Sequence, residues 1–146
     1  MFPTIYEWSV AHIRAVFEAK SEDACRRALA ETFAPDVEFT TNGRALAPPD
    51  LQRFVLAMVV GSGFRLQVHW QNALEVPRDE SNRDGVLGGY YIISNVRKQP
   101  AAGGAPSVRV ARHKFVNVVI ESQSDDCAVD SRRIVRLNLT ATDKPQ

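Results

Sequence analysis

The sequence predicts an α+β fold in a single domain that covers residues 1–146. We expect a curved, mixed or antiparallel sheet wrapped around three N-terminal helices, in the order α-α-β-α-β-β-β-β. Apolar residues recur at helical spacing in the first third of the chain and alternate with polar residues from Phe64 onward. Helices followed by a run of long strands are typical of the α+β class, in which the helices gather on one face of the sheet.

Length and composition indicate one globular core. The chain has 146 residues, of which 45% are hydrophobic, and its 18 Lys+Arg against 17 Asp+Glu give a formal net charge of +1. A domain of this size buries about 68–70% of the surface of its unfolded chain, so it needs no disulfides. The near-neutral charge excludes a strongly basic nucleic-acid binder and a highly charged disordered tail.

The two cysteines, Cys25 and Cys127, belong to no zinc-ligand spacing, so we expect free thiols and no metal. The segment Met1 to Trp8 has no basic stretch followed by an apolar core, as a secretion signal would. No run approaches the ~18 apolar residues that a membrane span requires. We therefore expect a cytoplasmic protein without a membrane partner.

The three expected helices have recognisable starts and ends. Thr4 and Ser21 are candidate N-caps of the first two helices, and Pro48-Pro49 opens the third. The first helix is apolar around most of its circumference, so we expect it to be largely buried. The second helix ends at Ala34, because Pro35 disfavours helical geometry in the residue before it.

The strands follow from the alternation of apolar and polar residues. They are expected at 37–41, 64–76, 86–98, 107–121 and 132–142. Asn42-Gly43 is a strong turn signal after the first strand, and Gly88-Gly89 allows a bend or bulge within the third. The connection from Gln99 to Pro106 is rich in Pro, Ala and Gly, so we expect an exposed and mobile hairpin connection.

A family resemblance rests on the stretch Thr32 to Phe39, where the end of a helix meets an acidic turn and the first strand. The Gly43-Arg44 turn then leads into the third helix, and the strand from Phe64 to Val76 follows it. With the order of elements, these features resemble the nuclear-transport-factor-2-like superfamily, which includes polyketide cyclases, scytalone dehydratase and ketosteroid isomerases. The resemblance covers nearly the whole chain and implies a cystatin-like cone, in which the sheet and helices enclose a pocket.

The chain departs from the ketosteroid isomerases at two places. Those enzymes carry an acidic base near the end of the first strand and a tyrosine on the first helix. The nearest positions here hold Thr40, Thr41 and Phe17, so we do not expect that activity. The scytalone dehydratase-like members use tyrosines, histidines and an asparagine and resemble this chain better, although no local motif fixes the match.

The orientation of strand 107–121 decides where a site would lie. One of its faces carries Val108, Val110, Arg112, Lys114, Val116, Val118 and Ile120, and the other carries Ala111, His113, Phe115, Asn117 and Val119. If the second face lines the pocket, His113 and Asn117 are adjacent polar groups in an apolar wall, as in many small-molecule sites. The first face would then point outward and form a homodimer interface. A bulge would reverse the assignment.

We predict three catalytic residues on these strands. His113 would move a proton near neutral pH, while Asn117 and Tyr91 would hold a substrate oxygen. The residues expected to shape the binding cavity are Trp8, His12, Phe39, Phe54, Trp70 and Leu137. Of the flanking strands, the positions expected to face the pocket are Trp70, Asn72, Val135, Leu137, Leu139 and Ala141.

These residues suggest a cofactor-free isomerase, cyclase or dehydratase that acts on a small, mostly apolar carbonyl or polyketide-type compound. The alternative is a non-catalytic ligand-binding or protein-interaction module that dimerises through its sheet. A positive patch for an acidic partner or an anionic substrate could form from Arg109, Arg112, Lys114, Arg132, Arg133 and Arg136. No aromatic residues interleave with these charges, so we expect no nucleic-acid partner.

Overall fold

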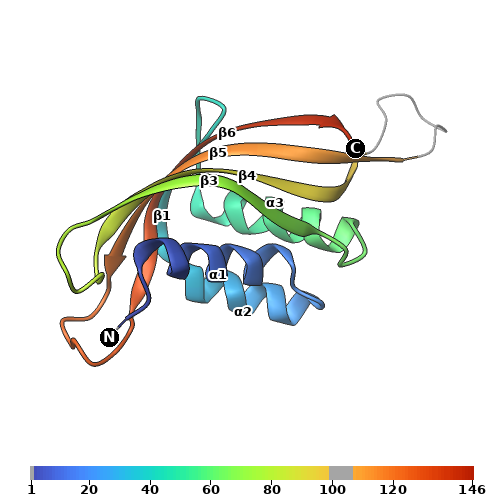
Figure 1. Cartoon of the computed structure of the whole chain (residues 1–146). Coiled ribbons are helices and arrows are strands. Elements are labelled where there is room, and N and C mark those ends of the chain that lie inside the picture. Colours follow the sequence, from blue (N-terminus) through green and yellow to red (C-terminus); the bar gives the residue numbers. More distant parts are fainter. Residues whose placement is uncertain (1, 99–106) are drawn as a thin grey trace.

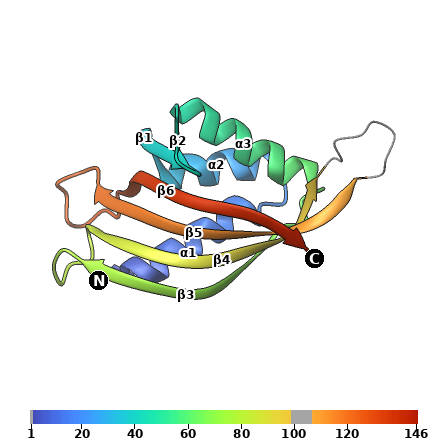
Figure 2. The same ribbon diagram turned by 90° about the horizontal axis from the view of Figure 1, so that it is seen from above.

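Three helices cover one face of a curved six-stranded sheet (Figures 1 and 2). The computed structural model describes residues 2–98 and 107–146. In chain order the elements are α1 (Ile5–Phe17), α2 (Glu22–Thr32), β1 (Phe33–Thr41), β2 (Arg44–Leu46), α3 (Pro48–Gly61), β3 (Gln67–Pro77), β4 (Gly85–Lys98), β5 (Val108–Ser122) and β6 (Arg132–Pro145). The connection Gln99–Pro106, expected to be exposed and mobile, lies outside the described residues.

The sheet has the strand order β2-β1-β6-β5-β4-β3 and is mixed, because β1 runs parallel to β6 while every other neighbouring pair is antiparallel. The predicted α+β class and the position of the helices on one face are confirmed. The strand β2 was not expected. It extends the Asn42-Gly43 turn into a short hairpin, in which Leu46 pairs with Phe39.

Both predicted helix caps are confirmed. The Thr4 hydroxyl accepts a hydrogen bond from the Glu7 backbone N–H, and the Glu7 carboxylate accepts one from the Thr4 N–H, which completes a capping box at the start of α1. The Ser21 hydroxyl accepts a hydrogen bond from the Ala24 N–H at 3.1 Å at the start of α2.

The second helix ends at Thr32, two residues before the predicted end at Ala34. Phe33 is already extended, with φ −111° and ψ 139°, and pairs with Ile134 of β6. This long-range pairing starts β1 at Phe33, rather than at Val37 as the alternation predicted. Pro35 lies where the pairing with β6 is interrupted, a position at which a strand tolerates the missing N–H.

Irregular pairing changes which residues face the helices. In β3 the register shifts between Trp70 and Asn72, so Gln71 is an extra residue. Trp70 keeps the predicted inward direction, but Asn72 is exposed, contrary to the prediction. A second register shift lies between β5 and β6, because Val119 pairs with Arg136 but Ile120 pairs with Ile134. As a result Ile134 is buried in the core, whereas Val135 was the residue expected to face the pocket.

The orientation predicted for β5 is wrong. Its inward face carries Val110, Val116, Val118 and Ile120, all of which are buried in the core. His113 and Asn117 therefore lie on the opposite face, the face of the sheet that the helices leave uncovered (Figure 2). The physical reason is that the inward face carries most of the apolar surface of the strand. The free energy gained by burying that surface exceeds the cost of placing Arg112 and Lys114 on the same face.

One end of the cone is closed around Arg132, whose side chain has no exposed surface. Its guanidinium donates hydrogen bonds to the Asp130 carboxylate and to the carbonyl oxygens of Pro3 and Asn82. It also lies 5.7 Å from the ring centroid of Trp8. This single side chain therefore joins the N-terminal segment to the β3–β4 and β5–β6 connections.

Within residues 2–98 and 107–146, no helix combines the length and the apolar character needed to cross a bilayer.

Candidate functional site

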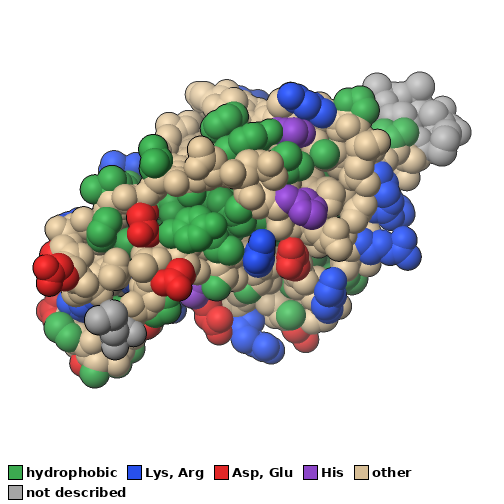
Figure 3. All heavy atoms as spheres, viewed as in Figure 1, with side chains coloured by type: hydrophobic (Ala, Val, Ile, Leu, Met, Phe, Trp, Pro, Cys, Tyr) green, Lys and Arg blue, Asp and Glu red, His purple; other side chains and the backbone are tan. Residues whose placement is uncertain are grey.

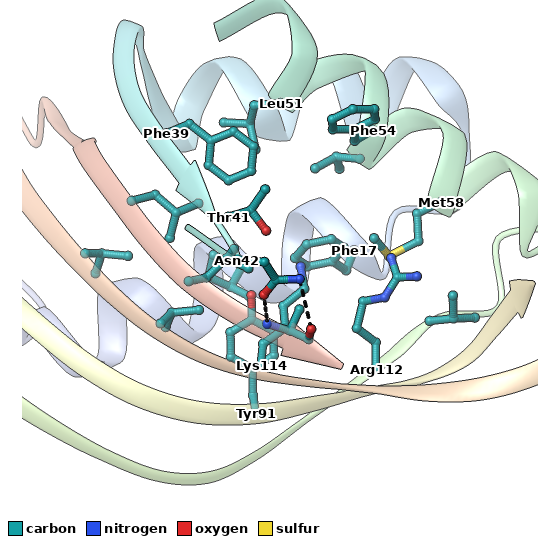
Figure 4. Close-up of a pocket in the computed structure, with 18 of the residues that line it drawn as sticks. Phe17, Phe39, Thr41, Asn42, Leu51, Phe54, Met58, Tyr91, Arg112 and Lys114 are labelled. Atoms are coloured by element: carbon teal, nitrogen blue, oxygen red, sulfur yellow. Dashed lines mark hydrogen bonds between the residues drawn. The ribbon is translucent and has the colours of Figure 1, made fainter. Parts of the chain in front are cut away.

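A cavity of about 690 Å³ lies between the helices and the concave face of the sheet (Figure 4). Its wall is mostly aliphatic and aromatic, with Phe17 from α1, Phe39 from β1 and Leu51 from α3. Lining residues that are also solvent-exposed mark its mouth, at one end of β4 and β6, along α3 and at the β1–β2 turn: Asn42, Phe54, Ala57, Arg97, Lys98 and Thr142. The size and the apolar character match a small-molecule site, which typically measures about 300–1,000 Å³.

Five of the nine predicted site residues line this cavity: Tyr91, Phe39, Phe54, Trp70 and Leu137. Two others, Trp8 and His12, are not in its wall. Their rings stack on each other with centroids 4.1 Å apart, beside the buried Arg132. Burial lowers the pKa of His12, although the hydrogen bond to the Trp8 carbonyl oxygen partly offsets this effect.

The remaining two, His113 and Asn117, do not line the cavity, which contradicts the site predicted from sequence. His113 Nδ1 lies 2.5 Å from the Tyr90 hydroxyl on the outer face of the sheet. The Tyr90 ring stacks on Phe115 at 4.4 Å, and Asn117 is exposed on the same face. These residues cannot touch a molecule held in the cavity.

Lys114 is a basic residue that the structure places inside the cone, on the inward face of β5. Only 6% of the residue is exposed, and its ammonium nitrogen lies 4.6 Å from the ring centroid of Phe17 and 5.9 Å from that of Tyr91 (Figure 4). Among the described residues it makes no hydrogen bond and no ion pair. Burial and, to a smaller extent, the positive charge of Arg112 lower the pKa of Lys114 to about 7, although Asp143 acts in the opposite direction.

The cavity mouth carries a network of charges around Asp143. Arg112 binds this carboxylate through Nε at 2.7 Å and Nη2 at 3.1 Å, and Lys98 Nζ lies 3.4 Å from it. The hydrogen bonds from Arg112 lower the pKa of Asp143, although partial burial opposes them. Arg97 adds a further positive charge, so the lining near the mouth has more basic than acidic groups.

Two more polar groups of the wall lack hydrogen-bond partners within the described part of the chain. They are the hydroxyl of Ser9 on α1 and the indole N–H of Trp70 on β3. Tyr91 is buried against Trp70, with ring centroids 4.7 Å apart, and burial raises its pKa. The Tyr91 hydroxyl therefore stays protonated and can donate a hydrogen bond to a bound oxygen.

Gly89 makes room for Trp70 in the wall. A Cβ atom at Gly89 would lie 2.7 Å from Cζ3 of the indole ring, closer than such atoms approach. The sequence analysis ascribed the Gly88-Gly89 pair to a bend or bulge in the strand, but β4 pairs without interruption with β5 at both glycines. The requirement at Gly89 is therefore space for a side chain of the neighbouring strand.

Comparison with solved structures identifies the fold. A protein from Xanthomonas campestris described as a calcium/calmodulin-dependent protein kinase II association domain is similar with a TM-score of 0.56 and 14% identity, over 92% of this chain and 86% of that chain. A nuclear-transport-factor-2-like protein of unknown function from Pseudomonas aeruginosa gives 0.53 and 20%, over 96% and 94%. The chain has the nuclear-transport-factor-2-like fold. A ketosteroid isomerase-like protein from Erwinia carotovora shares this fold with a TM-score of 0.54 and 16% identity, over 94% and 93%.

At these identities the likeness to other nuclear-transport-factor-2-like folds concerns architecture alone. No protein-family model matches the chain, and no curated protein matches it in sequence. A proposal for what this protein binds or catalyses must therefore rest on the residues that line its own cavity.

The sequence analysis placed Arg112 and Lys114 on the outward face and in a positive patch, not in the cavity, and it did not consider Asp143. A signal for Lys114 was present, since it shares its strand face with Val116, Val118 and Ile120. The predicted positive patch does not form, because its members are dispersed over the nuclear-transport-factor-2-like fold. Arg112 and Lys114 line the cavity and Arg132 is buried, whereas Arg136 pairs with Glu38 on the exterior.

Proposed function

We propose that the protein binds a small, mostly apolar compound inside the cone and contacts a carbonyl or carboxylate oxygen of that compound through Lys114. The observation that carries this proposal is the Lys114 ammonium, which projects into an apolar cavity of about 690 Å³ without an ionic partner among the described residues. A buried ammonium without a partner is costly, and a ligand oxygen would satisfy it. The basic groups at the mouth favour the entry of a compound with negative charge or a polarised oxygen.

The proposed reaction class is that of a cofactor-independent isomerase or lyase, such as a cyclase or dehydratase for polyketide-type compounds. Lys114 takes the central place that the sequence analysis gave to His113. The similarity in fold to a ketosteroid isomerase-like protein is compatible with this class. Cytoplasmic location is part of the proposal, and the two free thiols, buried Cys25 and exposed Cys127, suit a reducing compartment.

The binding proposal is tested with three probes that share one ring system: 2-naphthoic acid, 2-acetylnaphthalene and naphthalene. We expect the acid and the ketone to raise the melting temperature at pH 7 more than naphthalene does. Lys114→Met should weaken binding of the acid by about tenfold or more, because a hydrogen bond to a charged group contributes about 1.5–3 kcal/mol. His113→Ala should bind all three probes as the wild type does.

Two results would contradict the binding proposal. One is the absence of stabilisation by any of the three probes. The other is equal affinity of the wild type and Lys114→Met for the acid and the ketone, which would mean that the amine does not contact the ligand.

A second candidate function, dimerisation through the outer face of the sheet, is favoured by exposed apolar residues. Leu74 is 78% exposed, Val76 62% and Phe115 63%, and all three point away from the helices. Hydrophobic side chains also gather along β3 in the space-filling view (Figure 3). Val116, Val118 and Ile120, which the sequence analysis expected at the interface, face the core instead. The proposed interface therefore lies on the opposite face of the sheet and includes Leu74, Val76 and Phe115.

The association-domain and hub descriptions of two structural neighbours agree with such a role, although they describe those proteins. Light scattering at micromolar concentration should give the mass of a homodimer, and Phe115→Glu should give the mass of a monomer. Val129→Glu changes an exposed valine in the β5–β6 connection and should leave the mass unchanged. A monomeric wild type would exclude the dimer.

A further inference from the structure

We propose that Lys114 is a nucleophile that forms a reversible imine with an aldehyde or ketone bound in the cavity. The inference rests on the proposed function, because the carbonyl compound must first occupy the cone. It adds a covalent step, and with it a specific role for the amine that ion pairing alone would not require.

The first support is the placement of the amine. Lys114 projects from β5 into a wall of aromatic side chains, with Phe17 on one side and Tyr91 on another (Figure 4). The only carboxylate of the described lining belongs to Asp143, and Arg112 and Lys98 both bind it. The amine is thus free to react with a ligand, whereas a structural lysine at this depth would be paired.

The second support is the charge around the amine. Arg112 lies two residues away on the same face of β5, and β4 contributes Arg97 and Lys98, while β6 contributes Asp143. Within the described residues, α1, α3 and β1 add no ionisable side chain to the lining. An apolar pocket with a neighbouring cation is the environment that activates lysine for Schiff-base chemistry, since both features favour the neutral amine.

The electrostatics agree with this placement. Burial, helped by the positive charge of Arg112, lowers the pKa of Lys114 to about 7, from an ordinary value of 10.5. A large fraction of the amine is therefore unprotonated at neutral pH, whereas an exposed lysine is almost entirely protonated.

The chemistry balances without any further reactant. The lone pair of the amine forms a C–N bond to the carbonyl carbon, the C=O π bond breaks, and the oxygen takes up a proton as nitrogen loses one, giving a carbinolamine. Protonation of that hydroxyl and loss of water then give the imine. Water reverses both steps and regenerates the free amine, so nothing is oxidised or reduced.

An imine at this position would explain an isomerase or lyase without a cofactor. In its protonated form the C=N group draws electrons from the adjacent carbon, which makes the α-hydrogen acidic. Loss of that proton gives an enamine. Protonation at another carbon then isomerises the compound, and departure of a β-hydroxyl group as water dehydrates it.

The test uses 2-naphthaldehyde with sodium cyanoborohydride at pH 7, which reduces an imine to a stable secondary amine. The chain has four lysines. Lys20 and Lys144 are exposed outside the cavity lining and serve as internal controls, whereas Lys98 is exposed at the cavity mouth and paired with Asp143. Intact-mass measurement should show the gain of one naphthylmethyl group, and peptide mapping should locate it on Lys114. We expect Lys114 to react at least about tenfold faster than each exposed lysine.

Three variants separate imine formation from ion pairing and from misfolding. Lys144→Met, outside the cavity lining, should be trapped as the wild type is, whereas Lys114→Met should not be trapped. Lys114→Arg keeps a positive charge but no nucleophilic amine, so it should bind 2-naphthoic acid and yet form no adduct. Circular dichroism checks that each variant has folded.

The outcomes distinguish this inference from the binding proposal. If 2-acetylnaphthalene and 2-naphthoic acid bind but the aldehyde gives no adduct at Lys114, the imine is excluded and the binding function stands. Labelling spread equally over all four lysines also excludes it. If no probe binds and no adduct forms, both proposals fail.

Discussion

Arg112 and Asp143 form a two-point ion pair at the mouth of the cavity, with Nε 2.7 Å from Oδ1 and Nη2 3.1 Å from Oδ2. The two residues are also direct partners in the β5–β6 register, so the strand pairing and the ion pair support each other. Arg112 Nη1 additionally lies 3.8 Å from the sulfur of Met58 on α3. The pair thus holds one positive and one negative charge at fixed positions beside Lys114.

Breaking this pair from either side should move the pKa of Lys114 in opposite directions. Arg112→Met removes a cation that lowers the Lys114 pKa and leaves Asp143, which raises it, so the pKa should rise. Asp143→Asn should lower it by the same reasoning. The measurement is the pH midpoint of cyanoborohydride trapping of 2-naphthaldehyde at Lys114, and shifts of the same sign in both variants would contradict this account.

Lys114→Met should stabilise the protein at pH 7 by at least about 1 kcal/mol, because it removes a buried amine that is costly to charge. Between pH 7 and the ordinary lysine pKa of 10.5, the unfolded chain binds a proton at Lys114 that the folded chain does not. Wild-type stability should therefore rise with pH across this window, by up to about 1.4 kcal/mol per pH unit. The advantage of Lys114→Met should shrink over the same range.

Urea unfolding at several pH values checks this prediction. Lys144→Met, at an exposed site, should follow the wild-type dependence on pH. A constant difference between the wild type and Lys114→Met from pH 7 to pH 10 would show that the folded protein does not perturb this amine.

Arg132→Met should destabilise the protein by about 3–5 kcal/mol, since it leaves the Asp130 carboxylate and two carbonyl oxygens without their donor. Arg132→Lys keeps the charge but loses the forked geometry of the guanidinium, so its stability should lie between that of the wild type and that of Arg132→Met. The matched control is Arg136→Met on the same strand, where the exposed pair with Glu38 contributes about 0–1 kcal/mol. Equal melting temperatures for Arg132→Met and Arg136→Met would contradict the role given to Arg132.

Gly89→Ala should disturb the cavity wall, because its Cβ would lie 2.7 Å from the Trp70 ring. We expect a loss of about 1–3 kcal/mol and weaker binding of 2-acetylnaphthalene. Gly88→Ala is the control on the outer face, where the new Cβ would lie 3.1 Å from the side-chain oxygen of Asn117 and at an ordinary 3.9 Å from the Val116 carbonyl oxygen. Thermal unfolding should separate the two variants, and a larger loss for Gly88→Ala would argue against the packing role of Gly89.

The helices and the fold class could be predicted from the sequence because their signals are local. Thr4 and Ser21 cap helices through contacts within three residues, and the apolar repeat of α1 is independent of any partner. The start of β1 at Phe33 could not be predicted, since it depends on parallel pairing with Ile134, about a hundred residues away. The three-residue β2 lacks an alternation long enough to detect.

The site was only partly predictable, for two physical reasons. The aromatic wall residues Phe39, Phe54 and Trp70 follow from their apolar character and their positions. The reactive groups do not, because a lysine in a strand is expected on the outside and a histidine beside valines is expected within. In β5 the two tendencies conflicted, and burial of Val116 and its neighbours decided the orientation in favour of Lys114.

The extra residue Gln71 has a consequence for how this fold can diverge. Val68, Trp70, Leu74 and Val76 form one series at every second position, yet the first two face the helices and the last two face outward. Deleting Gln71 would remove the bulge, but the residues beyond it would keep their register and their sides of the sheet, because Trp70 and Asn72 already pair with the adjacent residues Tyr91 and Tyr90. The bulge therefore lets this strand gain or lose one residue without exchanging its exterior surface and its interior wall.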